Sequence, residues 1–257
     1  MQQIKDERIN MLSKSQISFV NALHQKKHRK EQGLFIAEGS KSIIEFVQSD
    51  YIVTTIFHTP EAAPKLYNLS QKVKLQEVTS SELKKISTLT TPHDALALIQ
   101  IPERTIPQQE SFKGKFVLVL DGIQDPGNLG TIIRTADWFG FADIICSSDT
   151  VDAYNPKVVQ ASMGSLSRIH IYYQDLSTFL SDVNMKIYGA LLEGNSLFET
   201  TFGEEGYIIL GNEGNGISEN VKTLIHNVVT IPRYGEAESL NVAISAAIIC
   251  SEIKRNK

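Results

Sequence analysis

The chain has 257 residues, of which 42% are hydrophobic and 21% charged, with a formal net charge of −4. This composition is typical of a soluble globular protein with room for two domains. No stretch approaches the ~20 apolar residues of a membrane span, and the charged N-terminal stretch lacks the apolar segment of a secretory signal. We therefore expect a cytoplasmic protein with no membrane partner.

The sequence gives no sign of a metal centre or a disulfide. Cys146 and Cys250 lie far apart in two apolar runs, so we interpret them as buried free thiols. The six histidines do not cluster at ligand spacing. We expect no metal cofactor.

The first hundred residues alternate between helical and strand patterns. Apolar side chains at Ile43, Ile44 and Val47, for example, follow the spacing of one helix face. Helices are expected over 14–23, 40–48, 64–71 and 80–86, and strands over 33–37, 51–57, 73–78 and 95–101. The alternation predicts a small α/β domain over residues 1–102. A basic run, HQKKHRK, occupies residues 24–30.

A polar segment with two prolines follows and is interpreted as a linker over 103–114. Residues 115–257 are then predicted to form a second α/β domain, with five or six strands of parallel type between helices. Strands are expected over 115–120, 143–146, 170–173, 187–192, 207–210 and 227–231, and helices over 131–139, 155–168, 177–184 and 242–253.

Two loops at strand ends draw attention, because ligands bind at such ends in open α/β sheets. The first, GNEGNG over 211–216, is so rich in glycine that its backbone needs positive φ angles or a close approach. A simple tight turn at Asn215-Gly216 is the alternative. The spacing matches neither a Rossmann nor a P-loop motif.

The second loop, IPRYGEAESLN over 231–241, leads into a helix with no charge before Glu252. Ser239 is the expected N-cap. Because Ala, Ile and Ser dominate this helix, we expect most of its surface to be buried.

These loops carry a family resemblance. GNEGNGIS and IPRYGEAESLNVAISAA resemble the second and third motifs of the SpoU/TrmH branch of the SPOUT RNA methyltransferases. The stretch DGIQDPGNLGTIIRTA, over 121–136, resembles the first motif through Asn128 and Arg134. The N-terminal stretch KKHRKEQGLFIAEGSKSIIEFVQS is similar to the opening of the family's substrate-binding domain, in which a basic loop precedes the first strand.

The resemblance implies a C-terminal SPOUT domain with a trefoil knot, an exception to the general absence of knots. It also implies S-adenosylmethionine as cofactor, held in the knot. A Cβ on Gly211 would occupy the space of a ring lying against the backbone. For Ile231 and Leu240 an ordinary core position is the alternative. The implied cofactor-binding residues are Leu192, Gly211, Asn212, Gly216, Ile231 and Leu240.

The activity that the resemblance implies is methyl transfer to a ribose 2′-hydroxyl. We expect Arg134 to bind the phosphate and ease formation of the alkoxide, since a guanidinium does not readily act as a base. Pairing of Arg134 with Asp137 is the alternative. The expected catalytic residues are Asn128, Arg134, Glu213, Ser239 and Asn241. Of these, Asn128 is also a natural turn residue, Ser239 a cap and Glu213 a loop charge, so we expect at least two of the four residues other than Arg134 to act structurally.

The implied partners are RNA and a second copy of the chain. Ribosomal RNA is favoured over transfer RNA, because the N-terminal domain resembles those used on folded ribosomal RNA. The basic run, which alone indicates only a solvated face, becomes a candidate phosphate contact. The candidate RNA-binding residues are Lys26, Lys27, Arg29, Lys30 and Arg134. A non-catalytic RNA-binding factor and a nucleotide-binding enzyme remain alternatives, although the latter lacks the required glycine spacing and a nearby lysine.

Overall fold

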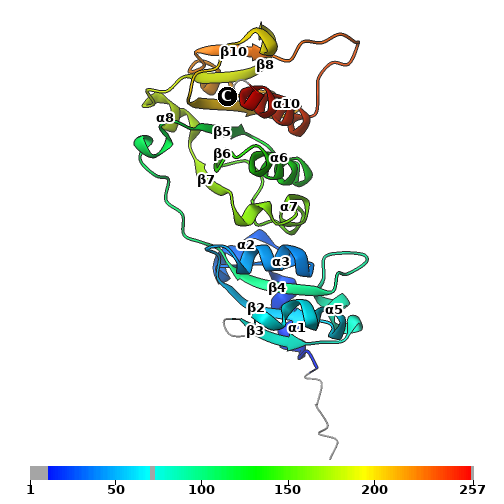
Figure 1. Cartoon of the computed structure of the whole chain (residues 1–257). Helices are drawn as coiled ribbons and strands as arrows, with labels where there is room; N and C mark the ends of the chain where they lie inside the picture. The colour runs from blue at the N-terminus through cyan, green and yellow to red at the C-terminus, as the bar shows by residue number, and fades with distance from the viewer. Residues whose placement is uncertain (1–10, 70–72, 256–257) are drawn as a thin grey trace, which may run out of the picture. The chain divides into compact units, whose positions relative to one another are not determined.

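The computed structural model describes residues 11–69 and 73–255. The chain divides into two compact units, which are coloured by residue number in Figure 1. The first holds Met1–Pro102 together with Tyr154–Gln160, and the second holds Glu103–Ala153 and Ala161–Lys257. Within the described part of the chain, no helix has the length and apolar character needed to cross a membrane.

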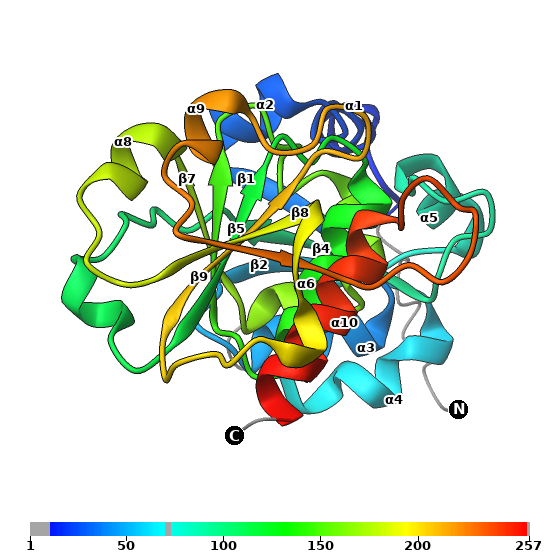
Figure 2. The same ribbon diagram turned by 90° about the horizontal axis from the view of Figure 1, so that it is seen from above.

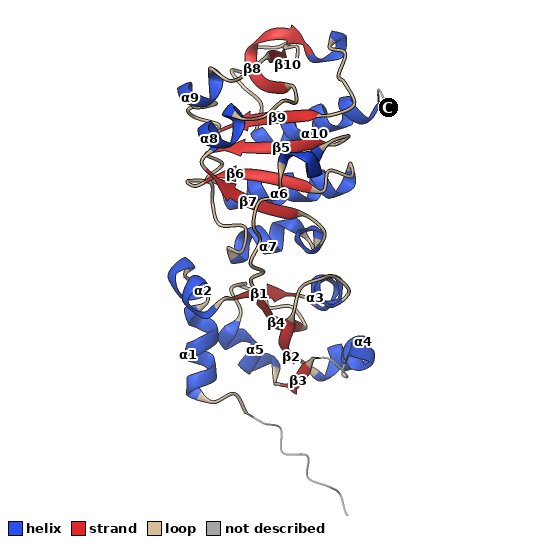
Figure 3. Cartoon of the chain, turned by 90° about the vertical axis from the view of Figure 1, so that its left-hand side faces the viewer, coloured by secondary structure: helices blue, strands red, loops and turns tan. Residues whose placement is uncertain are grey.

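The first unit contains a four-stranded mixed sheet with strand order β1-β4-β2-β3. Strand β4 pairs antiparallel with both β1 and β2, and β3 pairs parallel with β2 (Figure 3). The strands are β1 (Leu34–Glu38), β2 (Val53–His58), β3 (Lys74–Glu77) and β4 (Ala95–Gln100). The helices are α1 (Lys14–Ala22), α2 (Lys26–Gln32), α3 (Ser40–Val47), α4 (Ala63–Leu66) and α5 (Ser80–Ile86).

The helices of this unit follow the expectations with two differences. The basic run forms helix α2, which ends at Gly33 with φ +61°, so the basic loop implied by the resemblance is wrong. The helix expected over 64–71 is reduced to α4 between two 3₁₀ turns, and its last two residues lie outside the described part. Helix α5 is capped at its start, because Thr79 and Glu82 form a reciprocal capping box.

The second unit contains a six-stranded parallel sheet with strand order β10-β8-β9-β5-β6-β7, which confirms the predicted sheet. The strands are β5 (Phe116–Asp121), β6 (Asp143–Ser147), β7 (His170–Gln174), β8 (Ile187–Ser196), β9 (Gly206–Gly211) and β10 (Asn227–Thr230). The helices are α6 (Pro126–Trp138), α8 (Leu176–Ser181), α9 (Glu219–Lys222) and α10 (Val242–Arg255). Helix α7 (Pro156–Ser162) begins in the segment that belongs to the first unit, and its last two residues belong to the second.

Both faces of this sheet are covered. On one face, Val117, Val119 and Ile209 pack in a core with residues of α8 and α9. On the other face, α6 and α10 lie side by side (Figure 2). All six residues of β5 are buried, as expected for a strand covered on both faces.

The expected linker is only partly irregular. Residues Gln109–Phe112 form a 3₁₀ helix, and Phe112 is buried in the core of the second unit. Its ring contacts the ring of Tyr207 at a centroid distance of 6.2 Å. The aromatic side chain of Phe112 therefore anchors the end of the segment in this core. The mostly polar composition of the segment does not predict this anchor.

The predicted bounds differ most from the observed ones for α6 and α7. Helix α6 begins at Pro126, five residues before the expected start, with Asp125 as its N-cap. The helix expected over 155–168 ends at Ser162, because Met163 and Gly164 adopt φ angles of +49° and +92°.

The C-terminal helix α10 begins at Val242, and the predicted cap at Ser239 is wrong. The side-chain oxygen of Asn241 accepts hydrogen bonds from the backbone N–H groups of Ala243 (3.0 Å) and Ile244 (3.3 Å). The expectation that most of this helix is buried holds for one face only, since Ile244 is 50% exposed.

Candidate functional site

The loop after β9 turns back on itself within six residues. Asn212 and Gly216 exchange backbone hydrogen bonds of 2.9 and 2.8 Å, and Gly216 has φ +69°. A Cβ added to Gly211 would lie 2.3 Å from both the Gly216 carbonyl carbon and the Ile217 nitrogen. The requirement for glycine at 211 therefore comes from the returning loop itself, and our explanation by a ligand ring was wrong. Both positive φ and close approach, expected from the sequence, are present.

The side chain of Asn212 ties this loop to the loop after β5. Its Nδ2 donates to the Gly122 carbonyl at 2.7 Å, and its Oδ1 accepts from the Gly214 N–H at 2.8 Å. The Asp121 carboxylate makes a second tie by accepting from the Ser218 N–H at 2.7 Å. These bonds fix the ends of two adjacent parallel strands relative to each other.

A cavity of about 810 Å³ opens at the carboxyl ends of β8, β9 and β10. This volume lies within the range typical of small-molecule sites. All six residues predicted to bind the cofactor line it: Leu192, Gly211, Asn212, Gly216, Ile231 and Leu240. Leu240 is exposed and Ile231 only partly buried, so the alternative of an ordinary core position is excluded for both.

The lining of this cavity combines apolar walls with charged groups of both signs. Leu192 and Val229 contribute apolar surface, and Glu193, Glu213 and Glu238 contribute carboxylates. Such a lining suits a ligand that carries both an apolar part and charged groups. Among the described residues no cluster of side chains has the composition of a metal site.

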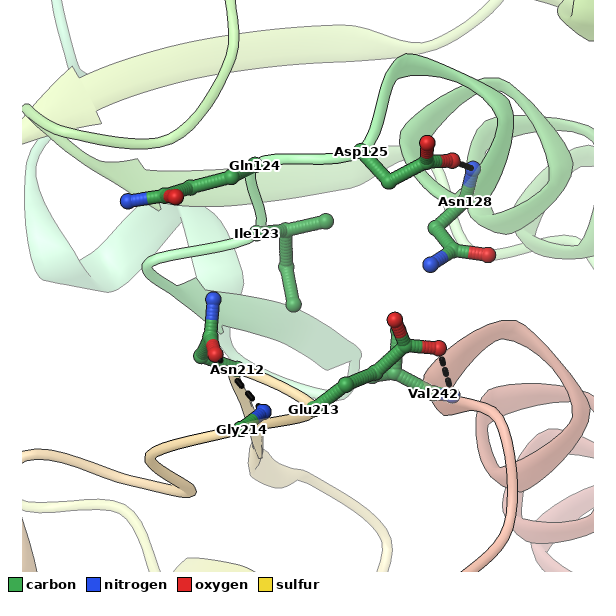
Figure 4. A pocket seen from close by; sticks show the side chains of 8 residues that line it. All are labelled: Ile123, Gln124, Asp125, Asn128, Asn212, Glu213, Gly214 and Val242. Atoms are coloured by element: carbon green, nitrogen blue, oxygen red, sulfur yellow. Dashed lines mark hydrogen bonds between the residues drawn. The ribbon is translucent and has the colours of Figure 1, made fainter.

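A smaller cavity of about 250 Å³ shares part of its wall with the larger one. Figure 4 shows the side chains that line it, from the loop after β5, the start of α6, the loop after β9 and the start of α10. The shared residues are Asn212, Glu213, Gly214 and Val242; the others are Ile123, Gln124, Asp125 and Asn128. Two ligands bound in these cavities would lie next to each other.

Three residues from the three sequence motifs meet in one hydrogen-bonded cluster beside this shared wall. The Asn241 amide donates to Asn128 Oδ1 at 2.9 Å and to Glu213 Oε1 at 2.6 Å. The same carboxylate oxygen accepts from the Val242 N–H at 3.4 Å, as drawn in Figure 4. Segments more than a hundred residues apart are thereby held together at the start of α10. We call Asn128, Glu213 and Asn241 the amide–carboxylate cluster.

Arg134 lies elsewhere on α6. It is exposed, lines neither cavity, and donates from Nη1 to the Met163 sulfur at 3.1 Å. Asp137, the alternative partner, is instead bound by Arg168 at 2.8 Å. Burial raises the pKa of Asp137, but hydrogen bonds from Arg168 and Ser165 outweigh this and lower it overall. Ser239 is exposed and lines the larger cavity.

The basic residues of α2 divide into two groups. Lys26, Lys27 and Lys30 are exposed, as a phosphate contact requires. Arg29 is only 1% exposed, and its Nη1 donates to the carbonyl oxygens of Leu23 and His24, both at 2.9 Å. Its guanidinium therefore holds the preceding chain in place, and it is not available on the surface for RNA.

Several residues of the two cavities were not predicted. Asp125 was recognisable, because an acidic residue directly before a proline is a common helix start. Gln124, Glu193 and Tyr234 carry no such local signal, since they come together only through the packing of separate strand ends. Lining residues that were not among the predicted site residues include Ile123, Gln124, Asp125, Glu193, Tyr234, Glu238, Val242 and Ser245.

Comparison with known proteins identifies the fold and its relatives. Residues 115–251 match the model of the SpoU rRNA Methylase family, and residues 14–97 match an MRM3-like substrate binding domain. The chain belongs to the SpoU rRNA methylase family. It is 30% identical to a 23S rRNA (guanosine(2553)-2′-O)-methyltransferase of Bacillus subtilis, over 90% of this chain and 93% of that protein.

Two solved structures of the family superpose along nearly the whole chain. A putative RNA methyltransferase of the TrmH family from Porphyromonas gingivalis has a TM-score of 0.86 and 38% identity, and the match covers 96% of this chain and all of that one. An AdoMet-bound rRNA methyltransferase from Sinorhizobium meliloti has a TM-score of 0.85 and 27% identity, over 95% and 97% of the two chains.

Proposed function

We propose that this protein is an S-adenosylmethionine-dependent RNA methyltransferase that methylates a ribose 2′-hydroxyl of ribosomal RNA. The single observation that carries this proposal is the meeting of all three motifs in the amide–carboxylate cluster, between two adjoining cavities. The relative from Bacillus subtilis bears the name of an enzyme with this activity. With ribosomal RNA as its substrate, the proposed location of the protein is the cytoplasm.

The larger cavity is the proposed cofactor site. Leu192, Ile231 and Leu240 supply apolar surface for the adenine, and the carboxylates of Glu193 and Glu238 suit the cationic groups of the cofactor. The AdoMet-bound structure from Sinorhizobium meliloti supports this choice of ligand. When bound, S-adenosylmethionine supplies the sulfonium methyl group that the ribose oxygen takes up.

The smaller cavity is the proposed site of the acceptor ribose. Its polar lining includes the amides of Gln124 and Asn128, which can hydrogen-bond a sugar or a base edge. Because the two cavities share a wall, an acceptor here would lie beside the transferable methyl group. The amide–carboxylate cluster keeps this wall in place. We therefore assign Glu213, Asn128 and Asn241 a mainly positioning role in this proposal.

Arg134 is proposed to act on the active site of a partner subunit in a homodimer. It lines neither cavity of its own chain, and the helices α6 and α10 expose Trp138 (84%) and Ile244 (50%). Large exposed apolar side chains on neighbouring helices favour association. In that dimer the Arg134 guanidinium would bind the RNA phosphate and stabilise the forming alkoxide while remaining protonated. The trefoil knot of this domain also remains a prediction.

The first unit is the proposed RNA-binding domain. Its match to an MRM3-like substrate binding domain supports this assignment. Lys26, Lys27 and Lys30 are retained as phosphate contacts, whereas Arg29 is withdrawn because it is buried and bound to backbone carbonyls. Contacts of this type weaken as salt concentration rises.

The test combines cofactor binding, oligomeric state and methyl transfer. Calorimetric titration with S-adenosylmethionine, with ATP and GTP as controls, is expected to show saturable binding of the first ligand only. Light scattering on the same sample should give the mass of a dimer. Methyl transfer to ribosomal RNA should disappear in Arg134→Ala, and cofactor binding should persist. Binding of ATP or GTP in place of S-adenosylmethionine would contradict the proposal.

The partner-subunit role of Arg134 has its own test. Arg134→Ala lacks the phosphate-binding group, and Leu240→Glu places a charge in the cofactor cavity. If Arg134 serves the partner's site, a mixed dimer of the two inactive variants assembles one site that has both the wild-type arginine and the wild-type cavity. In a 1:1 mixture that pairs at random, half of the dimers are mixed and each has one complete site, so recovery of about a quarter of the wild-type activity is expected. No recovery, with mixed dimers verified by mass spectrometry, would place Arg134 and its cofactor in one subunit.

A further inference from the structure

The turn between α7 and the following 3₁₀ helix holds an unusual backbone conformation. Met163 has φ +49°, and among the described residues no other non-glycine residue has a positive φ. Residues other than glycine, asparagine and aspartate rarely adopt this left-handed backbone conformation, because their Cβ atom approaches the following carbonyl oxygen. Ser162 and Leu166 on either side are fully buried, so the neighbouring packing imposes the strained conformation.

The strained residue has a side chain that is mostly exposed and that contacts Arg134. Met163 is 60% exposed, and its sulfur accepts the 3.1 Å hydrogen bond from Arg134 Nη1. Three residues further along the same helix, Asp137 binds Arg168 at the other end of the turn. The turn is therefore attached to α6 at two points, one through a strong ion pair and the other through a weak contact to sulfur.

The weak contact to sulfur suits Arg134, because its guanidinium must later leave the Met163 sulfur and bind a phosphate. An arginine side chain has many rotamers, and fixing it in the transition state has an entropic cost that prior ordering reduces. A thioether is a weak acceptor, so it orients a guanidinium without competing with a phosphate oxygen. A carboxylate in the same place would bind Arg134 too tightly to be exchanged.

We propose that Met163 is a positioning residue that pre-orients Arg134 for the RNA phosphate and releases it when the phosphate binds. The strained turn holds the Met163 sulfur next to the Arg134 side chain of α6. This inference rests on the proposed role of Arg134 in methyl transfer. It assigns a function to a residue outside the three motifs, and it explains why a non-glycine residue persists where glycine would relieve strain.

The contact is directly observable by NMR of methyl-labelled methionine, because the chain has only four methionines. Met163→Leu identifies the Met163 signal by its loss. That signal is expected to shift in Arg134→Ala, and again in the wild-type protein when a ribosomal RNA fragment is added. The signal of Met185, which is buried in the core of the second unit, is the internal control. An unchanged Met163 signal in Arg134→Ala would overturn the proposal.

Activity and stability should move in opposite directions. Met163→Gly relieves the positive φ, so its melting temperature should rise by about 2 °C. Both Met163→Gly and Met163→Leu remove the sulfur, so kcat should fall about fivefold with unchanged affinity for S-adenosylmethionine. Wild-type kcat in both variants would overturn the inference. If Arg134→Ala itself retains full activity, the proposed role of Arg134 is wrong. This outcome differs from a failure of the Met163 proposal alone, in which Arg134→Ala is inactive and both Met163 variants keep the wild-type kcat.

Discussion

Two carboxylates, one in each unit, hold the start of a helix to a distant loop. In the first unit, Asp94 accepts from the Ser40 backbone N–H (3.0 Å), the Ser40 hydroxyl (2.9 Å) and the Lys65 ammonium (2.8 Å) at the start of α3. In the second unit, Glu213 accepts from the Asn241 amide and the Val242 N–H at the start of α10. Local chemistry alone does not distinguish a structural from a functional carboxylate.

The surroundings of the two carboxylates differ. Asp94 is bound by a cation and a hydroxyl, and it lines neither of the two cavities. Glu213 is exposed, belongs to the wall shared by two cavities, and has an amide as its partner. A carboxylate that holds the start of a helix and also borders a cavity contributes to function by fixing the position of the cavity wall. Changes at the two positions should therefore affect different properties.

Among changes around the two carboxylates, the largest effect on activity is expected for Asn241→Ala. This change removes the bonds to Asn128 and Glu213 and also the cap of α10, so the wall between the cavities loses its fixed position. A displacement of about 1 Å near the reacting groups costs on the order of a hundredfold in rate, and the lost cap about 1 kcal/mol of stability. Methyl transfer and urea unfolding measure the two losses.

Ser239→Ala is the matched control for the stability loss. Ser239 was the cap expected from the sequence, but it is exposed and α10 begins after Asn241. Its loss should leave the free energy of unfolding within about 0.5 kcal/mol of the wild type. A larger loss in Ser239→Ala than in Asn241→Ala would show that the cap is misassigned.

Much of the second unit could be predicted from sequence. The continuous apolar runs at β5 and β9 indicate strands that are buried on both faces, and the glycine-rich loop indicates close backbone approach. The six residues predicted to bind the cofactor followed from motif resemblance, and they line one cavity. Strand order and motif order together decide that these loops meet at one edge of the sheet.

What the sequence did not reveal depends on contacts between distant segments. Arg29 and Lys30 are adjacent basic residues, and only the packing of α2 shows that the first is buried and the second exposed. The contact of Met163 with Arg134 likewise requires a break in a helical pattern, although no glycine or proline occupies position 163 itself. Amino-acid composition predicts neither the burial of Arg29 nor the contact of Met163 with Arg134, because both depend on tertiary packing.

Gly211→Ala tests whether the cavity loop is shaped by its own backbone. The added Cβ would meet Gly216 and Ile217 backbone atoms at 2.3 Å, so the loop must open. The expected cost is about 1–3 kcal/mol of stability, with weaker cofactor binding because the loop lines the cavity. Gly235→Ala is the control, since it lines the same cavity and a Cβ there meets nothing within 4 Å. Equal losses in both variants would contradict a steric origin.

The smallest effect, confined to stability, is expected for Asp94→Asn. Burial raises the pKa of Asp94, but hydrogen bonds from Lys65 and Ser40 outweigh it and lower the pKa to about 2. Because this value is below the ~3.9 of an unfolded aspartate, the carboxylate stabilises the fold above about pH 4 and loses that effect as the pH falls towards 2. We expect the variant to lose about 1 kcal/mol at pH 7 and nothing at pH 2, with methyl transfer unchanged.

Hydrogen exchange of a peptide covering α3, measured in the full chain, locates this loss in the first unit. Exchange of α3 should accelerate in Asp94→Asn at pH 7, whereas α10 should exchange as in the wild type. Lys65→Met separates the two interactions, because it removes the exposed ion pair and leaves the hydrogen bonds that Ser40 donates to Asp94. Its effect should be smaller, since exposed ion pairs contribute only about 0.2–1 kcal/mol. A loss of methyl transfer in Asp94→Asn with intact folding would remove the distinction between the two carboxylates, because Asp94 would then also serve the reaction.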